Sequence, residues 1–435
     1  MVVVKLVLLL TTVLMRCIFM AKKKIAYIQF PGSNTENETK NILQKHGMLP
    51  FGHLWNDSSE LLNDFDGFII LGGFSFEDRS RSGIIASLEP VVNELKKQAV
   101  LGKPVLGICN GAQILVESGL VPGNKEFDTL VSLTDNKRTV GGRIVGTGYF
   151  NKWCYIKPCE NAKSAFIKND GKPMKVPIAH AEGRFLFNDD LKAEILKNNL
   201  ITYKYCDSKG NLSGDFPTNP NGSLHSAAAL SNPTGNVMAI MPHPERTLKN
   251  EADDLFDSMK NYIESDSSFS YKALNFKSKK LSIQKFKKLS KSSELLISTI
   301  IADNEAASVE KCIHNLGVDA KVKKYVHFEV DTTESFDIDK VISTDVLFNP
   351  SKEYIAKTKE ESGVCRFLVR NKEDIVGQSL TQTLQDRFEL SDLKSIKRGI
   401  VWEVKINSHS IKKDVDLILN SHIFSNPVSQ ECHEY

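Results

Sequence analysis

Three short apolar runs, each followed by a glycine-rich turn, constrain the fold of the first half of the chain more than any other feature. They are KIAYIQF from Lys24, GFIILGGF from Gly67 and KPVLGICNGAQIL from Lys103, with helical patterns between them. Apolar runs of this length between helices are typical of parallel strands buried on both faces. We therefore expect an α/β fold with a doubly wound, mostly parallel sheet, in which ligands bind at the carboxyl ends of the strands.

Changes in composition divide the chain further. Its 435 residues are enough for two or three domains with cores of their own. A closing helix is expected at FDSMKNYIE from Phe256, and the stretch after it is rich in Ser and Lys and lacks Gly and Pro. This favours a solvated linker; a basic docking segment for an acidic partner or RNA is the alternative. We place the boundaries at 1–19 for an N-terminal extension, 20–264 for the α/β domain, 265–291 for the linker, and 292–358 and 363–435 for two small α+β repeats.

The two C-terminal segments look like copies of one unit. Each predicts a strand, a helix, an alternating strand, a second helix and an Asn-Pro pair. The matching pieces are helices at 308–315 and 379–388, strands at 325–330 and 400–406, and the pairs Asn349-Pro350 and Asn426-Pro427. A unit of this size cannot bury both faces of a small sheet alone, so we expect the copies to pair. Chance similarity between two ordinary α+β units is the alternative.

The N-terminal extension resembles a signal peptide only superficially. Its apolar run from Leu6 to Met15 is interrupted by Thr11 and Thr12, no small-residue cleavage site follows, and the stronger positive charge comes after the run. Ten residues cannot span a bilayer. We interpret the segment as an upstream extension of the reading frame or a short targeting tail, and expect a cytoplasmic protein without membrane contact.

Charge and cysteine content exclude further classes. With 56 Lys and Arg against 53 Asp and Glu, the balance argues against nucleic acid as the main partner. The eight cysteines contain no Cys-x-x-Cys pair, which fits free thiols in a reducing compartment. Cys154 and Cys159 are close in sequence, but no second pair or suitably spaced His completes a zinc site, so we expect no metal.

Cys109 is the one cysteine whose sequence context predicts a reactive thiol. It lies in Gly107-Ile108-Cys109-Asn110-Gly111, between a predicted strand and a predicted helix. A Gly-x-nucleophile-x-Gly turn needs both glycines because side chains there would clash. The helix N-terminus would stabilise a thiolate, and the N–H of Asn110 would point toward an oxyanion. A small buried Cys is the alternative interpretation.

A base for this thiol is predicted at the end of another strand. In Pro242-His243-Pro244-Glu245-Arg246, His243 would take and return the proton, and Glu245 would hold the imidazole tautomer. A structural core histidine is the alternative. The two motifs together, each at the end of a strand of one sheet, favour nucleophilic catalysis.

Polar and glycine-rich motifs supply further candidates. Gly72 and Gly73 end a predicted strand and can offer a backbone N–H near the strand-to-helix turn at Cys109. Arg79 and Arg81 could bind a carboxylate or contact a partner. AHAEGRF from Ala179 is not explained well by turn chemistry, whereas NPNGS from Asn219 is. We take as candidates for a partner interface Arg79, Arg81, His180, Glu182 and Arg184.

These motifs together resemble one family, the class I glutamine amidotransferases, and specifically the glutaminase subunits of phosphoribosylformylglycinamidine synthase. The motifs that carry the resemblance are FPGSN from Phe30, GGFSFEDRSRSG from Gly72, GKPVLGICNGAQIL from Gly102, AHAEGRF, NPNGS and MPHPER from Met241. The resemblance implies that Cys109 attacks the side-chain amide of glutamine, with His243 and Glu245 completing a triad. It also implies an oxyanion hole at Gly73 and Asn110, and substrate binding by Gln113 and Gly72.

The two repeats resemble the small subunit of the same synthase, through the Asn-Pro pairs and the strands HFEV and VWEV. The family's ATP-using step needs a large synthetase, and the remainder of this chain has no P-loop or comparable phosphate-binding region. The resemblance therefore implies a separate synthetase partner that uses ATP and Mg²⁺, and no cofactor in this chain. A free-standing hydrolase of the same fold and a noncatalytic scaffold are the alternatives.

Overall fold

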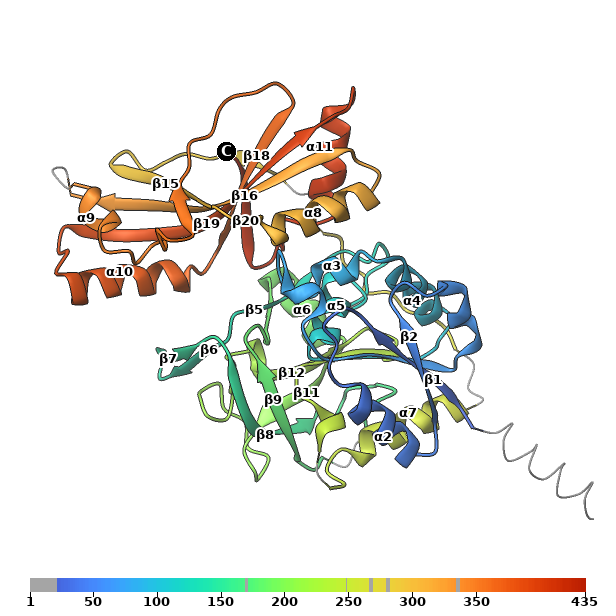
Figure 1. Cartoon of the computed structure of the whole chain (residues 1–435). Helices are drawn as coiled ribbons and strands as arrows, with labels where there is room; N and C mark the ends of the chain where they lie inside the picture. The colour runs from blue at the N-terminus through green and yellow to red at the C-terminus, as the bar shows by residue number, and fades with distance from the viewer. Residues whose placement is uncertain (1–21, 169–170, 248, 266–268, 279–281, 334–336) are drawn as a thin grey trace, which may run out of the picture. The chain divides into compact units, whose positions relative to one another are not determined.

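The computed structural model describes residues 22–168, 171–247, 249–265, 269–278, 282–333 and 337–435 (Figure 1). The chain divides into two compact units. The first comprises the chain up to Asp78 and from Ser82 to Ser278, and the second comprises Arg79–Arg81 and Lys279–Tyr435. The extension at 1–19 lies outside the described residues. Within the described ranges, no helix is long and apolar enough to cross a membrane.

The first unit is built on a nine-stranded sheet in the order β2-β1-β3-β4-β13-β12-β11-β8-β9. The strands are β1 (Lys24–Gln29), β2 (Leu49–Leu54), β3 (Gly67–Ile70), β4 (Val105–Ile108), β8 (Phe150–Pro158), β9 (Met174–His180), β11 (Ile201–Cys206), β12 (Ala227–Ser231) and β13 (Val237–Ile240). The strands from β2 to β13 pair in parallel, and the remaining pairings are antiparallel. The expected α/β fold is confirmed, with the predicted apolar runs forming β1, β3 and β4.

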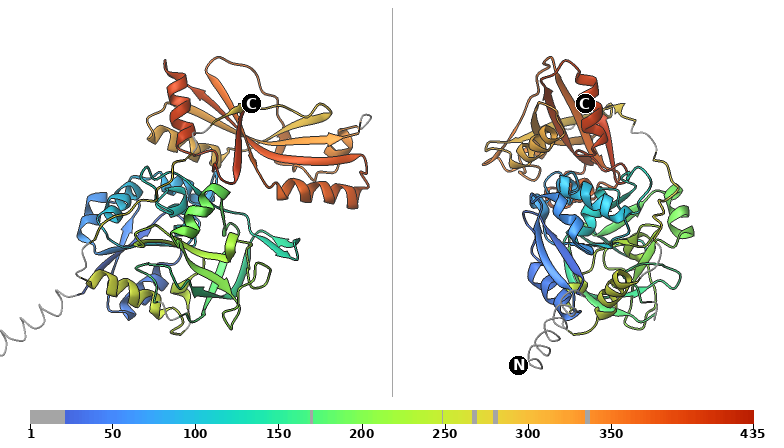
Figure 2. Two further views of the ribbon diagram at one scale, coloured as in Figure 1. Left: turned by 180° about the vertical axis from the view of Figure 1, so that it is seen from behind. Right: turned by 90° about the vertical axis from the view of Figure 1, so that its right-hand side faces the viewer.

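Helices cover both faces of this sheet, as in a doubly wound fold. α2 (Glu36–Lys45) and α7 (Asp253–Glu264) lie on one face, and α4 (Pro90–Val100) and α5 (Asn110–Glu117) on the other (Figures 1 and 2). All four residues of β3 and of β4 are buried, as the continuous apolar runs predict. Two short antiparallel pairs complete the unit: β5 (Val131–Thr134) with β10 (Arg184–Phe187), and β6 (Lys137–Val140) with β7 (Arg143–Thr147).

The second unit is a seven-stranded sheet in the order β14-β20-β18-β19-β16-β15-β17. One half contains β15 (Ser292–Thr299), α8 (Asn304–Asn315), β16 (Ala320–Thr332), α9 (Asp339–Ile342) and β17 (Glu353–Ile355). The other contains β18 (Val364–Asn371), α10 (Ile375–Phe388), β19 (Leu393–Ile406), α11 (Ile411–Asn420) and β20 (Gln430–Glu434). Both halves have the same order of elements, and β16 pairs antiparallel with β19 from Ala320 to Thr332.

The first helix of each half begins four residues earlier than the sequence predicted. The cause is a capping aspartate. The side chain of Asp303 accepts from the N–H of Ala306, and that of Asp374 accepts from the N–H of Gly377. A side-chain oxygen that satisfies a free N–H of the first turn stabilises a helix start.

The stretch predicted as a solvated linker is partly built into both units. Leu274 is only 3% exposed and its N–H donates to the carbonyl of Gly123, while Asn124 donates to the carbonyl of Phe276. Further on, β14 (Gln284–Lys285) pairs with β20. The prediction of a solvated segment is therefore wrong around Leu274, which packs against the first unit, whereas both residues of β14 are exposed.

Candidate active site

The strand-to-helix turn at Cys109 is a strained elbow. Cys109 follows β4, precedes α5 and has φ 53° and ψ −106°, in the half of conformational space that non-glycine residues rarely adopt. A Cβ at Gly107 would lie 2.4 Å from the carbonyl oxygen of Gly111, and one at Gly111 would lie 2.1 Å from that of Ile70. Both glycines are thus required by backbone contact, and they fix the sulfur at the N-terminal end of α5.

His243 and Glu245 form a buried pair at the carboxyl end of β13. His243 Nδ1 lies 2.6 Å from Glu245 Oε1, and both side chains are buried. Burial opposes protonation of the ring, but the Glu245 carboxylate and then the Cys109 sulfur outweigh it and raise the pKa of His243 to about 10. The other ring nitrogen, Nε2, has no hydrogen-bond partner in the described part of the chain. Glu245 therefore orients the ring through Nδ1 and leaves Nε2 available. The contribution of the Cys109 sulfur to the pKa of His243 indicates that the three predicted residues lie together.

The Gly72-Gly73 turn lies against this histidine. A Cβ at Gly72 would be 2.9 Å from His243 Cε1, so only glycine leaves room for the ring. The N–H of Gly72 donates to Thr35 Oγ1 at 3.1 Å and is not available to a ligand. Gly73 forms an isolated antiparallel bridge with Ser33. The hydrogen bonds of this bridge run from the N–H of Asn34 to the carbonyl of Gly72 and from the N–H of Phe74 to the carbonyl of Gly32. Neither bond uses the N–H of Gly73. This amide can act as an oxyanion donor.

The side-chain amides of Asn110 and Gln113 form a chain of hydrogen bonds next to Cys109. Asn110 accepts from the N–H of Ser75 at 3.0 Å and donates to Asp78 at 3.2 Å and to Gln113 Oε1 at 2.9 Å. Gln113 in turn donates to the carbonyl of Glu182 at 2.7 Å. Both ends of the Gln113 amide therefore bond to the protein, an arrangement that holds Asn110 and the Glu182 segment in place.

Asp78 and Glu182 are half-buried carboxyls that sequence reasoning did not place in one cluster. Burial, followed by the proximity of Glu182, raises the pKa of Asp78 to about 7, and burial raises the pKa of Glu182 as well. Ser82 forms hydrogen bonds that oppose both shifts. A carboxyl that can hold a proton near neutral pH thus lies one hydrogen bond from Asn110.

Two of the residues predicted for a partner interface are interior. His180 is 3% exposed and lies 3.2 Å through Nδ1 from Asn136 Oδ1, and burial, followed by the proximity of His243, lowers its pKa to about 3. Arg184 is 5% exposed and donates through Nε to the carbonyl of Asp135. Assignment of these two to a protein surface is wrong, because the AHAEGRF segment turns inward. Arg79 and Arg81 are half-buried, as is Glu182.

Three further contributors were not predicted as site residues. Thr35 holds the Gly72 turn, the carbonyl of Ala179 lies 3.8 Å from Cys109 Sγ, and Asn136 bonds the AHAEGRF segment at the carbonyl of His180 and the N–H of Gly183. Each lies more than 30 positions from the group that it contacts, so no local sequence pattern could have revealed it.

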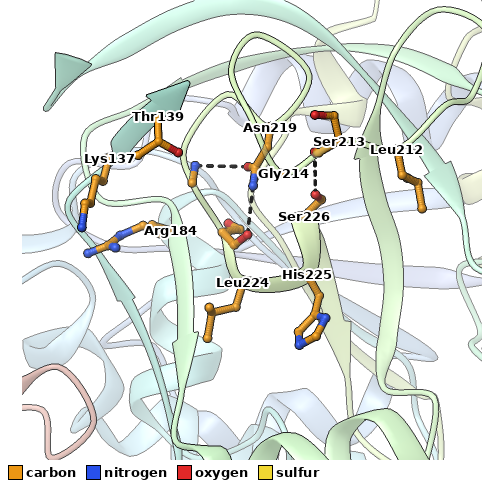
Figure 3. Close-up of a pocket in the computed structure, with 12 residues that line it drawn as sticks. Lys137, Thr139, Arg184, Leu212, Ser213, Gly214, Asn219, Leu224, His225 and Ser226 are labelled. Atoms are coloured by element: carbon orange, nitrogen blue, oxygen red, sulfur yellow. Dashed lines mark hydrogen bonds between the residues drawn. The ribbon is translucent and has the colours of Figure 1, made fainter. Parts of the chain in front are cut away.

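The NPNGS motif forms a turn beside a separate cavity of about 450 Å³ (Figure 3). The Asn219 side chain accepts from the N–H of Gly222 at 3.1 Å and donates to the carbonyl of Ser223 at 3.0 Å. These bonds agree with turn chemistry as the origin of the motif. Lys137 and Arg184 line one side of the cavity (Figure 3).

Among the described residues, no group of three or more His, Cys, Asp or Glu could hold a metal ion.

Comparison with known proteins identifies the class. Residues 22–276, more than half of the chain, match the model of the CobB/CobQ-like glutamine amidotransferase domain. The chain belongs to this family and is a glutamine amidotransferase.

The relatives with similar sequences share one more specific name. The chain is 40% identical over 259 residues to the phosphoribosylformylglycinamidine synthase subunit PurQ of Methanothrix thermoacetophila, which covers 55% of this chain and 98% of the relative. The same subunit of Methanocaldococcus jannaschii is 39% identical, over 51% of this chain and 89% of the relative. A solved structure of PurLQS from Thermotoga maritima matches 56% of this chain and all of that chain, with 28% identity and a TM-score of 0.44.

The Glu245→Gln substitution is expected to lower the pKa of His243, because the carboxylate is the group that raises it most against the effect of burial. The raised pKa contributes stability that is complete below the ordinary pKa of 6.5 and is lost as the pH rises through about 10. The difference in free energy of unfolding between wild type and variant should therefore shrink between about pH 6 and pH 10. Urea unfolding across this range measures it, with Glu264→Gln, an exposed carboxylate on α7, as control. A difference that stays constant with pH contradicts the assignment.

Proposed function

We propose that the chain is the glutaminase component of a cytoplasmic phosphoribosylformylglycinamidine synthase in purine biosynthesis. It would hydrolyse glutamine to glutamate and ammonia and pass the ammonia to a separate synthetase, which uses ATP and Mg²⁺ to convert formylglycinamide ribonucleotide to the amidine. The observation that carries the proposal is the strained Cys109 elbow together with the 2.6 Å pair of His243 and Glu245. The names of the PurQ relatives, which the chain matches over nearly their whole length, supply the pathway.

The geometry supports acyl transfer through a thioester. With its pKa raised to about 10, His243 would already hold the thiol proton at neutral pH, and Cys109 Sγ would attack the side-chain carbonyl carbon of glutamine as a thiolate. The N–H groups of Gly73 and Asn110 would stabilise the oxyanion. As the C–N bond breaks, His243 returns the proton to the leaving ammonia. Water, deprotonated by the same ring, then hydrolyses the thioester to glutamate and regenerates Cys109.

We propose that the second unit serves as the bridge to the synthetase. Its two halves share one order of elements, each starts its first helix with a capping aspartate, and β16 and β19 join them. These observations support a duplicated small subunit whose two copies pair within one chain. Covalent pairing would keep the ammonia donor and acceptor docked, so that ammonia is not lost to solvent.

The test is glutamate release from glutamine by the purified chain, with and without a phosphoribosylformylglycinamidine synthetase, ATP and formylglycinamide ribonucleotide. Release that rises only in the presence of the partner and its substrates supports a gated ammonia donor. Release that is indifferent to the partner indicates a free-standing hydrolase. No release under any condition indicates a noncatalytic scaffold and overturns the proposal.

A further inference from the structure

The sheet of the second unit carries a cavity of about 300 Å³ that the proposed glutaminase activity does not use. Side chains of β16, β18 and β19 and of the connection between β17 and β18 surround it. The charged or polar lining residues are Lys321, Lys323, Tyr325, Lys357, Thr358, Lys359, Glu361, Arg366, Glu403 and Lys405.

The cavity has a buried, ordered floor. Arg366 Nε donates to Glu403 Oε2 at 2.7 Å, and Tyr325 Oη lies 3.5 Å from Glu403 Oε1. Lys323 reaches the same carboxylate at 3.3 Å. Glu403 and Tyr325 are buried, and Arg366 also donates to the carbonyl of Lys359, which ties the connection to the floor. The floor is thus a fixed arrangement that positions the lysines around it.

Positive charge around the floor exceeds negative charge. Six cationic side chains line the cavity against two carboxylates. Glu403 is shared by Arg366 and Lys323, and Glu361 pairs with Lys405 at 2.9 Å. Lys357 and Lys359 form no ion pair with a carboxylate within the part of the chain that the structure describes. The two cationic lining residues without such a pair therefore both lie on the connection that borders the cavity, which also carries Glu360 and Glu361.

The strand register brings two further lysines of the lining next to each other. Lys321 of β16 stands directly opposite Lys405 of β19. Like charges at directly opposite positions of an antiparallel pair destabilise the sheet. Lys321 pairs with Glu310 at 2.8 Å and Lys405 with Glu361 at 2.9 Å, which compensates part of the repulsion. An anion bound between these strands would offset the remainder.

We propose that this cavity binds a compact polyanion of the phosphate class, an oligophosphate chain. Lysine ammonium groups are point charges suited to phosphate oxygens, and the surplus of cations calls for a ligand with several negative charges in a small volume. The lysines that line the cavity contact the phosphates, and Arg366 and Glu403 of the floor hold the surrounding strands and the connection in position. The oligophosphate is either inorganic or the phosphate tail of a nucleotide.

Calorimetric titration of the full chain with sodium triphosphate tests the proposal, with ATP as a second arm. The variant is Lys357→Gln with Lys359→Gln, and the control is Lys412→Gln with Lys413→Gln, two exposed lysines of α11 that give the same change in net charge. We expect binding that weakens with salt, at least about tenfold weaker binding in the variant, within the range of one charged contact, and unchanged binding in the control. Glutamine hydrolysis should be the same in both.

Two results overturn the proposal: no detectable binding of either probe, or an equal loss of affinity in variant and control, which would show attraction to net charge alone. Binding of triphosphate but not ATP assigns the site to an inorganic oligophosphate. Binding of ATP at least as tight as that of triphosphate assigns it to a nucleotide. The glutaminase assay is independent of this titration, so failure here leaves the proposed function untouched.

Discussion

Cys109→Ala is expected to reduce glutamine hydrolysis by about 10⁴-fold or more, the scale on which loss of a triad member acts. The variant removes the sulfur, which lies 3.8 Å from the carbonyl of Ala179 and interacts with His243, and we expect it to leave the fold because alanine is smaller and fits the same buried position. Synthesis by the synthetase partner with added ammonium salt should persist at the wild-type rate. The measurements are glutamate release and amidine formation with either nitrogen source.

Cys159→Ala is the matched control for that experiment. This cysteine is half-buried in the same unit, and burial raises the pKa of its thiol, so it is a weak nucleophile. The control should retain full glutamine hydrolysis. Loss of ammonia-dependent synthesis in Cys109→Ala would contradict a pure donor role, and substantial hydrolysis by that variant would show that Cys109 is not the nucleophile.

Gly111→Ala is expected to destabilise the protein by about 3 kcal/mol or more, at the upper end of the cost of overpacking. The added methyl group would lie 2.1 Å from the carbonyl oxygen of Ile70 and 2.7 Å from its carbon, and these are backbone atoms of β3 that cannot rotate away. Either α5 or β3 must move, and the elbow moves with them. The measurement is the urea midpoint of the full chain, followed by tryptophan fluorescence.

Gly214→Ala is the control for Gly111→Ala. A Cβ at Gly214 meets no atom within 4 Å, and its backbone is not in the left-handed region. The midpoint of this variant should equal that of the wild type or rise slightly, because alanine restricts the unfolded chain. An equal fall in both variants would mean that the close approach of α5 and β3 does not determine the stability of the elbow.

The parts of the fold that were predictable are those whose cause is local. Continuous apolar runs gave β3 and β4, and the paired glycines around Cys109 indicated a tight turn whose backbone contacts the structure now shows. Helix starts were missed because one capping aspartate stands outside each apolar pattern. In these cases a single neighbouring residue decided the outcome.

The interior of the site was less predictable because it depends on contacts between distant segments. His180 and Arg184 have polar side chains that would ordinarily be exposed, yet Asn136 and Asp135 supply partners for them from another loop. Asp78 obtains its raised pKa from burial and from Glu182, about a hundred positions away. No periodicity or spacing in the sequence specifies which loops meet.

The buried Leu274 has a practical consequence for anyone who wishes to study the amidotransferase unit by itself. A fragment that stops at Glu264, after the last helix of the unit, would omit the chain that bonds Gly123 and Asn124 and would expose the apolar surface beneath Leu274. Expression of such a fragment should yield an aggregation-prone product. A fragment that extends to Ser278 keeps this segment and is the better choice for crystallisation.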